Sequence, residues 1–221
     1  MSGLQEFLAQ RGSTILECLM QHIYLTLVAM TVAIAVAVPL GLLLTRSKRF
    51  AKYMIGGVGV IQTLPSLALV GLMVPLLGAG PKACITALFL YALLPIVRNT
   101  HTGVMNVDPA MVEAARGMGM SSLQILFKIQ LPLSVPVIMA GVRTSTIICV
   151  GVATLGGIVN AGGLGLLIWI GIDRSNDTLI YAGAFPAMGL ALVLDYILAL
   201  AEKAFTPKGI LLRIGQPQQR A

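Results

Sequence analysis

Long apolar segments recur along the chain, and they constrain its fold more than any other feature. A helix needs roughly 20 mostly apolar residues to cross a bilayer. The sequence of 221 residues contains such segments at about 22–44, 53–77, 83–104, 131–158 and 179–200. Only 10% of the residues are charged, whereas a soluble domain usually carries about 25%. The sequence therefore predicts one all-α transmembrane domain over residues 1–221, with five membrane-spanning helices.

The second predicted span is interrupted near its middle. The stretch QTLPSLA places Pro65 there, and proline both removes a backbone donor and kinks a helix. Such a break persists in a bilayer only where protein or water satisfies the freed backbone groups. We therefore expect this helix to face the protein interior. Thr63, Pro65 and Ser66 are candidates for a pathway or gate, although serine and threonine also pack ordinary membrane helices.

Positive charge predicts the orientation of the chain, because cytoplasmic loops carry an excess of lysine and arginine. With five spans and an external N-terminus, the cytoplasmic side holds eleven basic residues: Arg46, Lys48, Arg49, Lys52, Arg98, Arg116, Lys128, Lys203, Lys208, Arg213 and Arg220. The outer side holds three: Arg11, Lys82 and Arg174. The sequence therefore predicts an outside N-terminus, a cytoplasmic C-terminus and a cytoplasmic loop between the third and fourth spans.

Residue types that carry enzyme chemistry form no pattern in this sequence. The three cysteines lie singly among apolar residues and lack metal-ligand spacing. The glycine-rich stretches 56–60 and 160–165 are not followed by the lysine and serine of a phosphate-binding loop. The net charge of +7 comes mainly from connections between spans, which indicates topology and not nucleic-acid binding. We expect no catalytic site, metal site or cofactor in this chain, and lipid around its spans.

An amphipathic segment, residues 108–130, separates the third and fourth spans. Asp108 is suited to cap a helix, with proline following at the first helical position. Gly117 and Gly119 are suited to end that helix, since glycine can take the left-handed conformation. Ser121 or Ser122 is suited to cap a second short helix. Pro132 is expected to end the second helix and begin the next span. The segment is predicted to form two short helices across the cytoplasmic mouth of a bundle.

This segment resembles the signature loop of the permeases of ATP-binding cassette (ABC) importers. The matching positions are Glu113, Ala114, Ala115, Gly119, Ile129, Leu131 and Pro132. Two longer stretches, 63–120 and 131–165, are similar to permeases that import glycine betaine, carnitine and choline. Together they cover nearly half of the chain.

The resemblance implies a type I importer permease fold, in the inner membrane of a bacterial or archaeal cell, with a role in osmoprotection. It implies that the loop is a coupling helix that docks on a dimer of cytosolic ATP-binding subunits, which hold the ATP and Mg²⁺. Glu113 would meet a basic group of the ATPase, and Gly119 would fix the angle between the short helices. A second permease chain, identical or paralogous, and a separate extracytoplasmic solute-binding protein complete the implied transporter.

A single cation lies inside the fourth predicted span. Arg143 follows Pro132 by 11 residues, which is about 16 Å along a helix. A charge at the centre of a spanning helix costs about 2.5 to 3.5 kcal/mol on insertion scales and usually faces a bundle interior or cavity. Two interpretations stay open: a pathway or gate residue beside Thr144, or an ion pair with Asp195 in the last span.

Two other functions fit a membrane chain of this size. An ion-coupled secondary transporter of small amines usually shows internal repeats and paired broken helices, but only the break at Pro65 is evident. A membrane anchor subunit of an enzyme complex does not need a coupling loop, and no haem or metal-ligand spacing is present. A co-purifying ATPase distinguishes the ABC permease from both.

Overall fold

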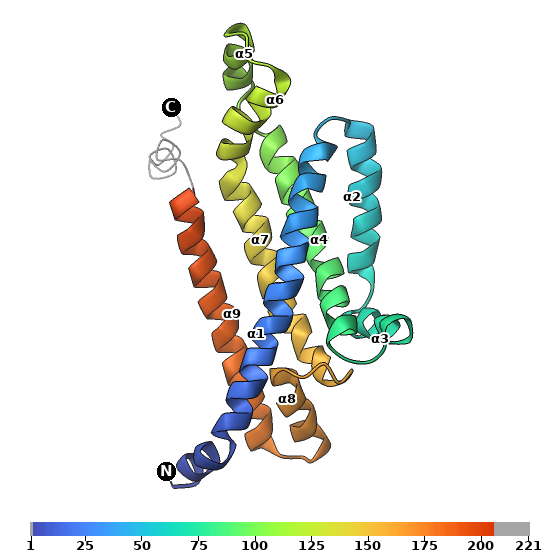
Figure 1. Cartoon of the computed structure of the whole chain (residues 1–221), viewed down its shortest axis with the longest axis vertical. Coiled ribbons are helices and arrows are strands. Elements are labelled where there is room, and N and C mark those ends of the chain that lie inside the picture. The colour runs from blue at the N-terminus through green and yellow to red at the C-terminus, as the bar shows by residue number, and fades with distance from the viewer. Residues whose placement is uncertain (1, 206–221) are drawn as a thin grey trace, which may run out of the picture.

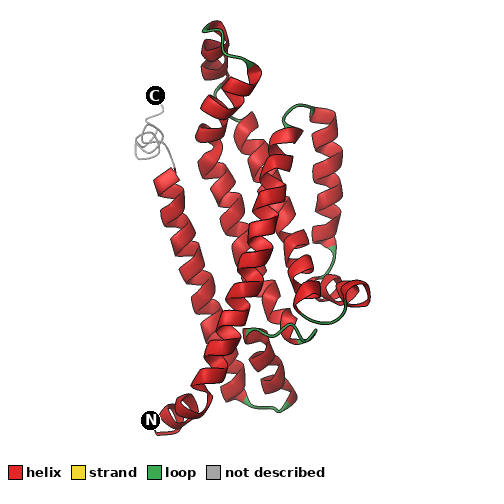
Figure 2. Ribbon diagram, in the orientation of Figure 1, coloured by secondary structure: helices red, strands yellow, loops and turns green. Residues whose placement is uncertain are grey.

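The computed structural model describes residues 2–205, and the side chains of residues 11–205. The described residues are almost entirely helical and contain no strand (Figure 2), so the all-α prediction is confirmed. The helical elements are α1 (Ser2–Leu44), α2 (Lys48–Thr63), α3 (Ser66–Leu77), α4 (Pro81–Met105), α5 (Pro109–Gly117), α6 (Ser122–Ile125), η1 (Leu126–Gln130), α7 (Leu131–Ala153), η2 (Thr154–Gly157), α8 (Leu164–Asp173) and α9 (Asp177–Phe205).

Four helical stretches of the described chain are long and apolar enough to cross a membrane: Arg11–Leu44, Pro81–Met105, Ser122–Gly157 and Asp177–Phe205. The fifth is not one straight helix. α2 and α3 together have the length and composition of a span, but they meet at an angle of 96°. The segment 53–77 is therefore a broken span, with Pro65 at the bend.

The predicted end of the loop's second helix at Leu131–Pro132 is wrong. α6, η1 and α7 follow one another without interruption. The N–H of Leu131 donates to the carbonyl of Leu126, five residues back, so the chain makes one wide π turn here. Such a turn changes the hydrogen-bond register inside a helix, and it lets the helix continue past a proline that has no N–H to donate.

α4 is the central helix of the bundle and packs against α1, α7, α2 and α3. Glycine permits its closest contacts. A Cβ added at Gly41 of α1 would lie 2.6 Å from Thr100 Cβ, and one at Gly141 of α7 would lie 2.7 Å from the carbonyl oxygen of Pro95. Small residues let membrane helices approach closely, and van der Waals packing then holds them.

Polar side chains in the bundle bond to backbone carbonyls of neighbouring helices. Ser145 Oγ donates to the Ala92 carbonyl at 2.9 Å, and the Cys149 thiol lies 3.5 Å from the Leu88 carbonyl. His22 Nε2 lies 3.1 Å from the Val150 carbonyl. These contacts join α4 to α7 and α7 to α1, and they satisfy polar groups away from water.

The two ends of the bundle differ (Figure 1). The loop of α5 and α6, the α1–α2 turn and the C-terminal end of α9 lie at one end. The start of α1, the turn between α3 and α4 and the short helix α8 lie at the other. α8 has ten residues and packs against α9 and η2, and it is too short to cross a bilayer.

The close approach at Gly141 gives a test of packing. Gly141→Ala is expected to destabilise the chain, because a methyl group there meets the Pro95 carbonyl and Asn99, and overpacking typically costs about 1 to 3 kcal/mol. Gly151→Ala is the matched control on the same helix, since an added Cβ there meets nothing within 4 Å. Thermal unfolding of the two detergent-solubilised variants measures the difference; equal stability would contradict the packing described here.

Candidate functional site

The projecting loop begins with a well-capped helix. Asp108 Oδ1 accepts a hydrogen bond from the N–H of Ala110 at 2.9 Å, and Pro109 occupies the first turn of α5. At the other end, Gly119 has φ +81°. The N–H of Gly119 donates to the Arg116 carbonyl, and the N–H of Met120 to the Ala115 carbonyl. This pair of bonds is a Schellman motif, so Gly119 sets the direction in which the chain leaves α5.

A reciprocal cap starts the second helix. Gln124 N donates to Ser121 Oγ at 3.4 Å, and Ser121 N donates to Gln124 Oε1 at 2.8 Å. The sequence predicted a serine cap but not the part played by Gln124. The spacing of serine and glutamine over three residues is the sequence signal of such a capping box. With both helix ends fixed, the turn between α5 and α6 is well defined.

The two alanines of the signature differ in position. Ala114 is exposed, like Glu113, whereas Ala115 is buried against the rest of the loop. Only Ala114 is therefore available for close approach by a partner. Ile129, Leu131 and Pro132 are partly buried where the loop joins α7.

Exposed apolar side chains surround the loop, and the sequence analysis did not select them. They are Met111, Met118, Leu123 and Phe127, which are 45 to 73% exposed. Figure 1 shows α5 and α6 projecting beyond the other helices at that end of the bundle. Exposed apolar residues grouped around a charged one are typical of interaction surfaces, and methionine adapts readily to a partner's shape.

Protein atoms satisfy the break at Pro65. Gln62 Nε2 donates to the Tyr91 carbonyl at 2.9 Å, and the Tyr91 hydroxyl donates to the Leu64 carbonyl. The Leu64 carbonyl at the break thus has a hydrogen-bond donor from α4, as a break in a bilayer requires. Thr63 and Pro65 are nonetheless exposed in the single chain, and Ala51 is the buried residue of α2. The expected interior position of this helix is therefore not achieved within one chain.

Arg143 lies between two carboxylates of α9. Its Nε and Nη2 lie 2.9 and 3.0 Å from the two oxygens of Asp195, and its Nη1 lies 3.2 Å from Glu202 Oε2. Glu202 was not among the residues predicted from the sequence, although it follows Asp195 by seven residues, which is two helical turns. Thr144 instead donates to the Ala140 carbonyl of its own helix.

The predicted pathway residues do not come together. Thr63, Pro65 and Ser66 lie at the α2–α3 bend, while Arg143 bonds to α9. Figure 1 shows α2 and α9 on opposite sides of the bundle. A path that includes both groups does not run through a single copy of this chain.

Comparison with known sequences decides the family. The pattern of the binding-protein-dependent transport system inner membrane components matches residues 37–208, more than half of the chain. The chain belongs to this family. The permease is 44% identical over 210 residues to the glycine betaine/carnitine/choline transport system permease protein OpuCB of Bacillus subtilis, covering 95% of this chain and 97% of the relative. It is 45% identical over the same length to the choline transport system permease protein OpuBB of that organism.

A third relative is the osmoprotectant import permease protein OsmW of Salmonella typhimurium, 43% identical over 86% of this chain and 91% of its own. Among solved structures, the MetNI methionine ABC transporter superposes with a TM-score of 0.73 at 23% identity, covering 87% of this permease and 96% of that chain. An amino acid ABC transporter superposes with a TM-score of 0.68 at 19% identity, covering 90% of this permease and 96% of that chain. The fold is that of type I ABC importer permeases. The family match and the relatives named as transport system permeases decide against an ion-driven transporter or an enzyme anchor.

Proposed function

We propose that this permease imports a quaternary ammonium compatible solute such as glycine betaine, carnitine or choline across the inner membrane. The observation that carries the substrate class is the similarity at 44 to 45% identity, over 95% of the chain, to permeases named for these solutes. Methionine and other amino acids are less well supported, because the superposed transporters share at most 24% of the sequence.

The projecting loop supports coupling to an ATPase. Its helix ends are fixed by caps, and its outer surface combines Glu113 and Ala114 with exposed apolar side chains. Such a surface suits a groove on a cytosolic subunit. ATP and Mg²⁺ would then bind to that partner, present as a dimer, and the loop would transmit its movement to the membrane helices.

A second permease chain, identical or related, completes the proposed pathway. The bend at Pro65 is exposed in the single chain, and an interface with the second chain would cover it. A separate extracytoplasmic binding protein would deliver the solute to the end of the bundle that holds α8.

Cysteine labelling tests the proposed orientation. The N-terminus is expected outside and the C-terminus in the cytoplasm, because lysine and arginine concentrate in cytoplasmic loops. A cysteine at Ser2 should react with an impermeant reagent in intact cells. A cysteine at Gln218, beyond the described residues, should react only after lysis. The background carries serine at the three native cysteines, and labelling of both sites from one side would contradict five crossings.

Uptake in proteoliposomes tests the substrate class. The permease is reconstituted with the ATPase and binding protein that co-purify with it, and radiolabelled glycine betaine, choline and carnitine are supplied outside. We expect ATP-dependent accumulation of at least one, and competition among those that share the site. Labelled methionine is the control solute. Accumulation driven by an ion gradient without ATP, or transport of methionine alone, would contradict the proposal.

A further inference from the structure

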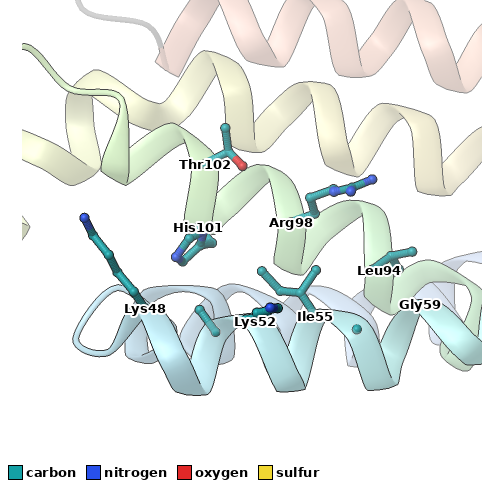
Figure 3. A pocket seen from close by; sticks show the side chains of 10 residues that line it. Lys48, Lys52, Ile55, Gly59, Leu94, Arg98, His101 and Thr102 are labelled. Carbon is teal, nitrogen blue, oxygen red and sulfur yellow. The ribbon is translucent and has the colours of Figure 1, made fainter.

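A groove of about 640 Å³ lies between α2 and α4, near the end of the bundle that carries the loop (Figure 3). Its lining residues are Lys48, Ala51, Lys52, Ile55, Gly56, Gly59, Leu94, Arg98, His101 and Thr102. The volume falls in the range of small-molecule sites, about 300 to 1,000 Å³. Three of these residues are always cationic at neutral pH and none is acidic, so the groove favours a negatively charged ligand.

The cations of the groove have no carboxylate partners in the described part of the chain. Among residues 11–205, the ion pairs are those that Arg143 of α7 forms with Asp195 and Glu202 of α9. Lys48, Lys52 and Arg98 are exposed. His101 Nε2 is buried and has no hydrogen-bond partner among the described residues, and Figure 3 shows its ring reaching from α4 toward α2. Donors therefore gather at this end of the groove without an acceptor.

The polarity of the groove changes along its length. Lys48 begins α2 and Lys52 follows one turn later. Ile55 and Gly59 continue the same face of the helix, with Gly59 about 16 Å beyond Lys48 at 1.5 Å per residue. A Cβ added at Gly59 would lie 4.0 Å from Leu94 of α4. The groove is thus basic at the end of the bundle and apolar toward the middle of the membrane.

We propose that this groove binds an anionic phospholipid of the cytoplasmic leaflet. Lys48, Lys52 and Arg98 neutralise its phosphate, His101 donates a hydrogen bond to it, and an acyl chain lies along the apolar part. Basic pockets between membrane helices on the cytoplasmic side take such headgroups. A soluble anion would leave the apolar half unused. The inference rests on the proposed function for one point, the cytoplasmic location of the α1–α2 turn.

Native mass spectrometry of the purified permease–ATPase complex tests the site. The probes are phosphatidylglycerol and phosphatidylcholine with the same acyl chains. We expect the parent to retain phosphatidylglycerol in preference. A basic residue near an anionic headgroup strengthens binding about fivefold, so Lys48→Gln with Lys52→Gln should weaken phosphatidylglycerol binding about 25-fold and leave phosphatidylcholine unchanged.

A double substitution elsewhere at the same end is the matched control. Arg46→Gln with Arg49→Gln removes the same charge from the α1–α2 region but from residues that do not line the groove. This variant should retain phosphatidylglycerol within about twofold of the parent, because the retained groove residues still supply the local attraction. If this variant loses as much phosphatidylglycerol binding as the groove variant, the lipid is attracted by the overall positive charge of this end, and the proposed site in the groove is refuted.

A third variant tests the apolar part without changing charge. Gly59→Leu adds a side chain to the groove beside Leu94, and the first carbon of that side chain lies at ordinary contact distance, 4.0 Å, from Leu94. It should reduce retention of phosphatidylglycerol while the complex stays assembled. Equal binding of both lipids by the parent, or no lipid on the assembled complex because the second permease covers the groove, would overturn the proposal.

Solute uptake separates this inference from the proposed function. Accumulation of glycine betaine, choline and carnitine is measured on the same preparations in phosphatidylcholine vesicles with and without phosphatidylglycerol. Selective lipid binding in a complex that imports none of the three solutes would refute the proposed function and leave the lipid site standing. Import of one of these solutes by a complex that shows no lipid preference would refute the lipid site and support the proposed function.

Discussion

Gly119→Val is expected to leave the permease in the membrane and to separate ATP hydrolysis from solute uptake. Gly119 has φ +81°, a conformation that costs an L-residue about 1 to 2 kcal/mol and a β-branched one more. An equal loss in the stability of the correctly bent loop lowers the ratio of correctly bent to misdirected loops about 5- to 30-fold. We expect uptake in proteoliposomes to fall, by up to that factor, with weaker co-purification of the ATPase.

Two substitutions serve as controls for Gly119→Val. Gly117→Val lies in the last turn of α5, where φ is not positive and an added Cβ meets nothing within 4 Å, so it should couple nearly as well as the parent. Gly119→Asn should recover much of the activity, because asparagine tolerates the left-handed conformation. If Gly119→Val couples hydrolysis to uptake as well as the parent, the loop is only a tether.

The charge of Glu113 adds an independent test of docking. Glu113→Lys reverses an exposed charge on the outer surface of α5, and like charges brought together at an interface cost several kcal/mol. We expect loss of the ATPase from the purified complex, with normal membrane insertion. Glu113→Gln, which removes the charge without reversing it, should have a smaller effect. If both variants co-purify with as much ATPase as the parent does, Glu113 does not contact a basic group of the ATPase.

Arg143→Ala is expected to destabilise the bundle strongly. Arg143 joins α7 to α9 through Asp195 and Glu202. Its removal leaves two carboxylates of one membrane helix without their cationic partner, and intramembrane charges are costly unless they are paired. We expect a lower unfolding temperature in detergent and less assembled complex in membranes.

The exchange of the two partners distinguishes an ion pair from a pathway residue. Arg143→Asp combined with Asp195→Arg restores opposite charges on α7 and α9, and it should recover part of the lost stability. Thr144→Ala is the control on the same helix, since its hydroxyl donates to the Ala140 carbonyl of α7 itself. If Arg143→Ala leaves stability and assembly intact but changes transport, Arg143 belongs to the pathway and the ion pair is not its main role.

The sequence by itself determined the local features of this protein. The apolar segments, the cap at Asp108 and the positive-φ turn at Gly119 follow from hydrogen bonds and side chains within a few residues of one another. The spaced signature of the loop belongs to the same class, because its residues lie on two adjacent short helices. The apolar segments were enough to predict an all-α membrane protein, and the resemblance of the loop to ABC importer permeases implied a coupling role for it.

The tertiary structure alone decided which residues meet. The sequence placed Arg143 beside Asp195 as one of two alternatives, but the geometry of α7 against α9 added Glu202. Likewise, only packing shows that Ala115 is buried while Ala114 is exposed, and that Tyr91 of α4 bonds to the backbone at the Pro65 bend. The groove beside Lys52 arises in the same way. Such contacts join residues tens of positions apart, and their geometry depends on how whole helices cross, which local sequence patterns do not encode.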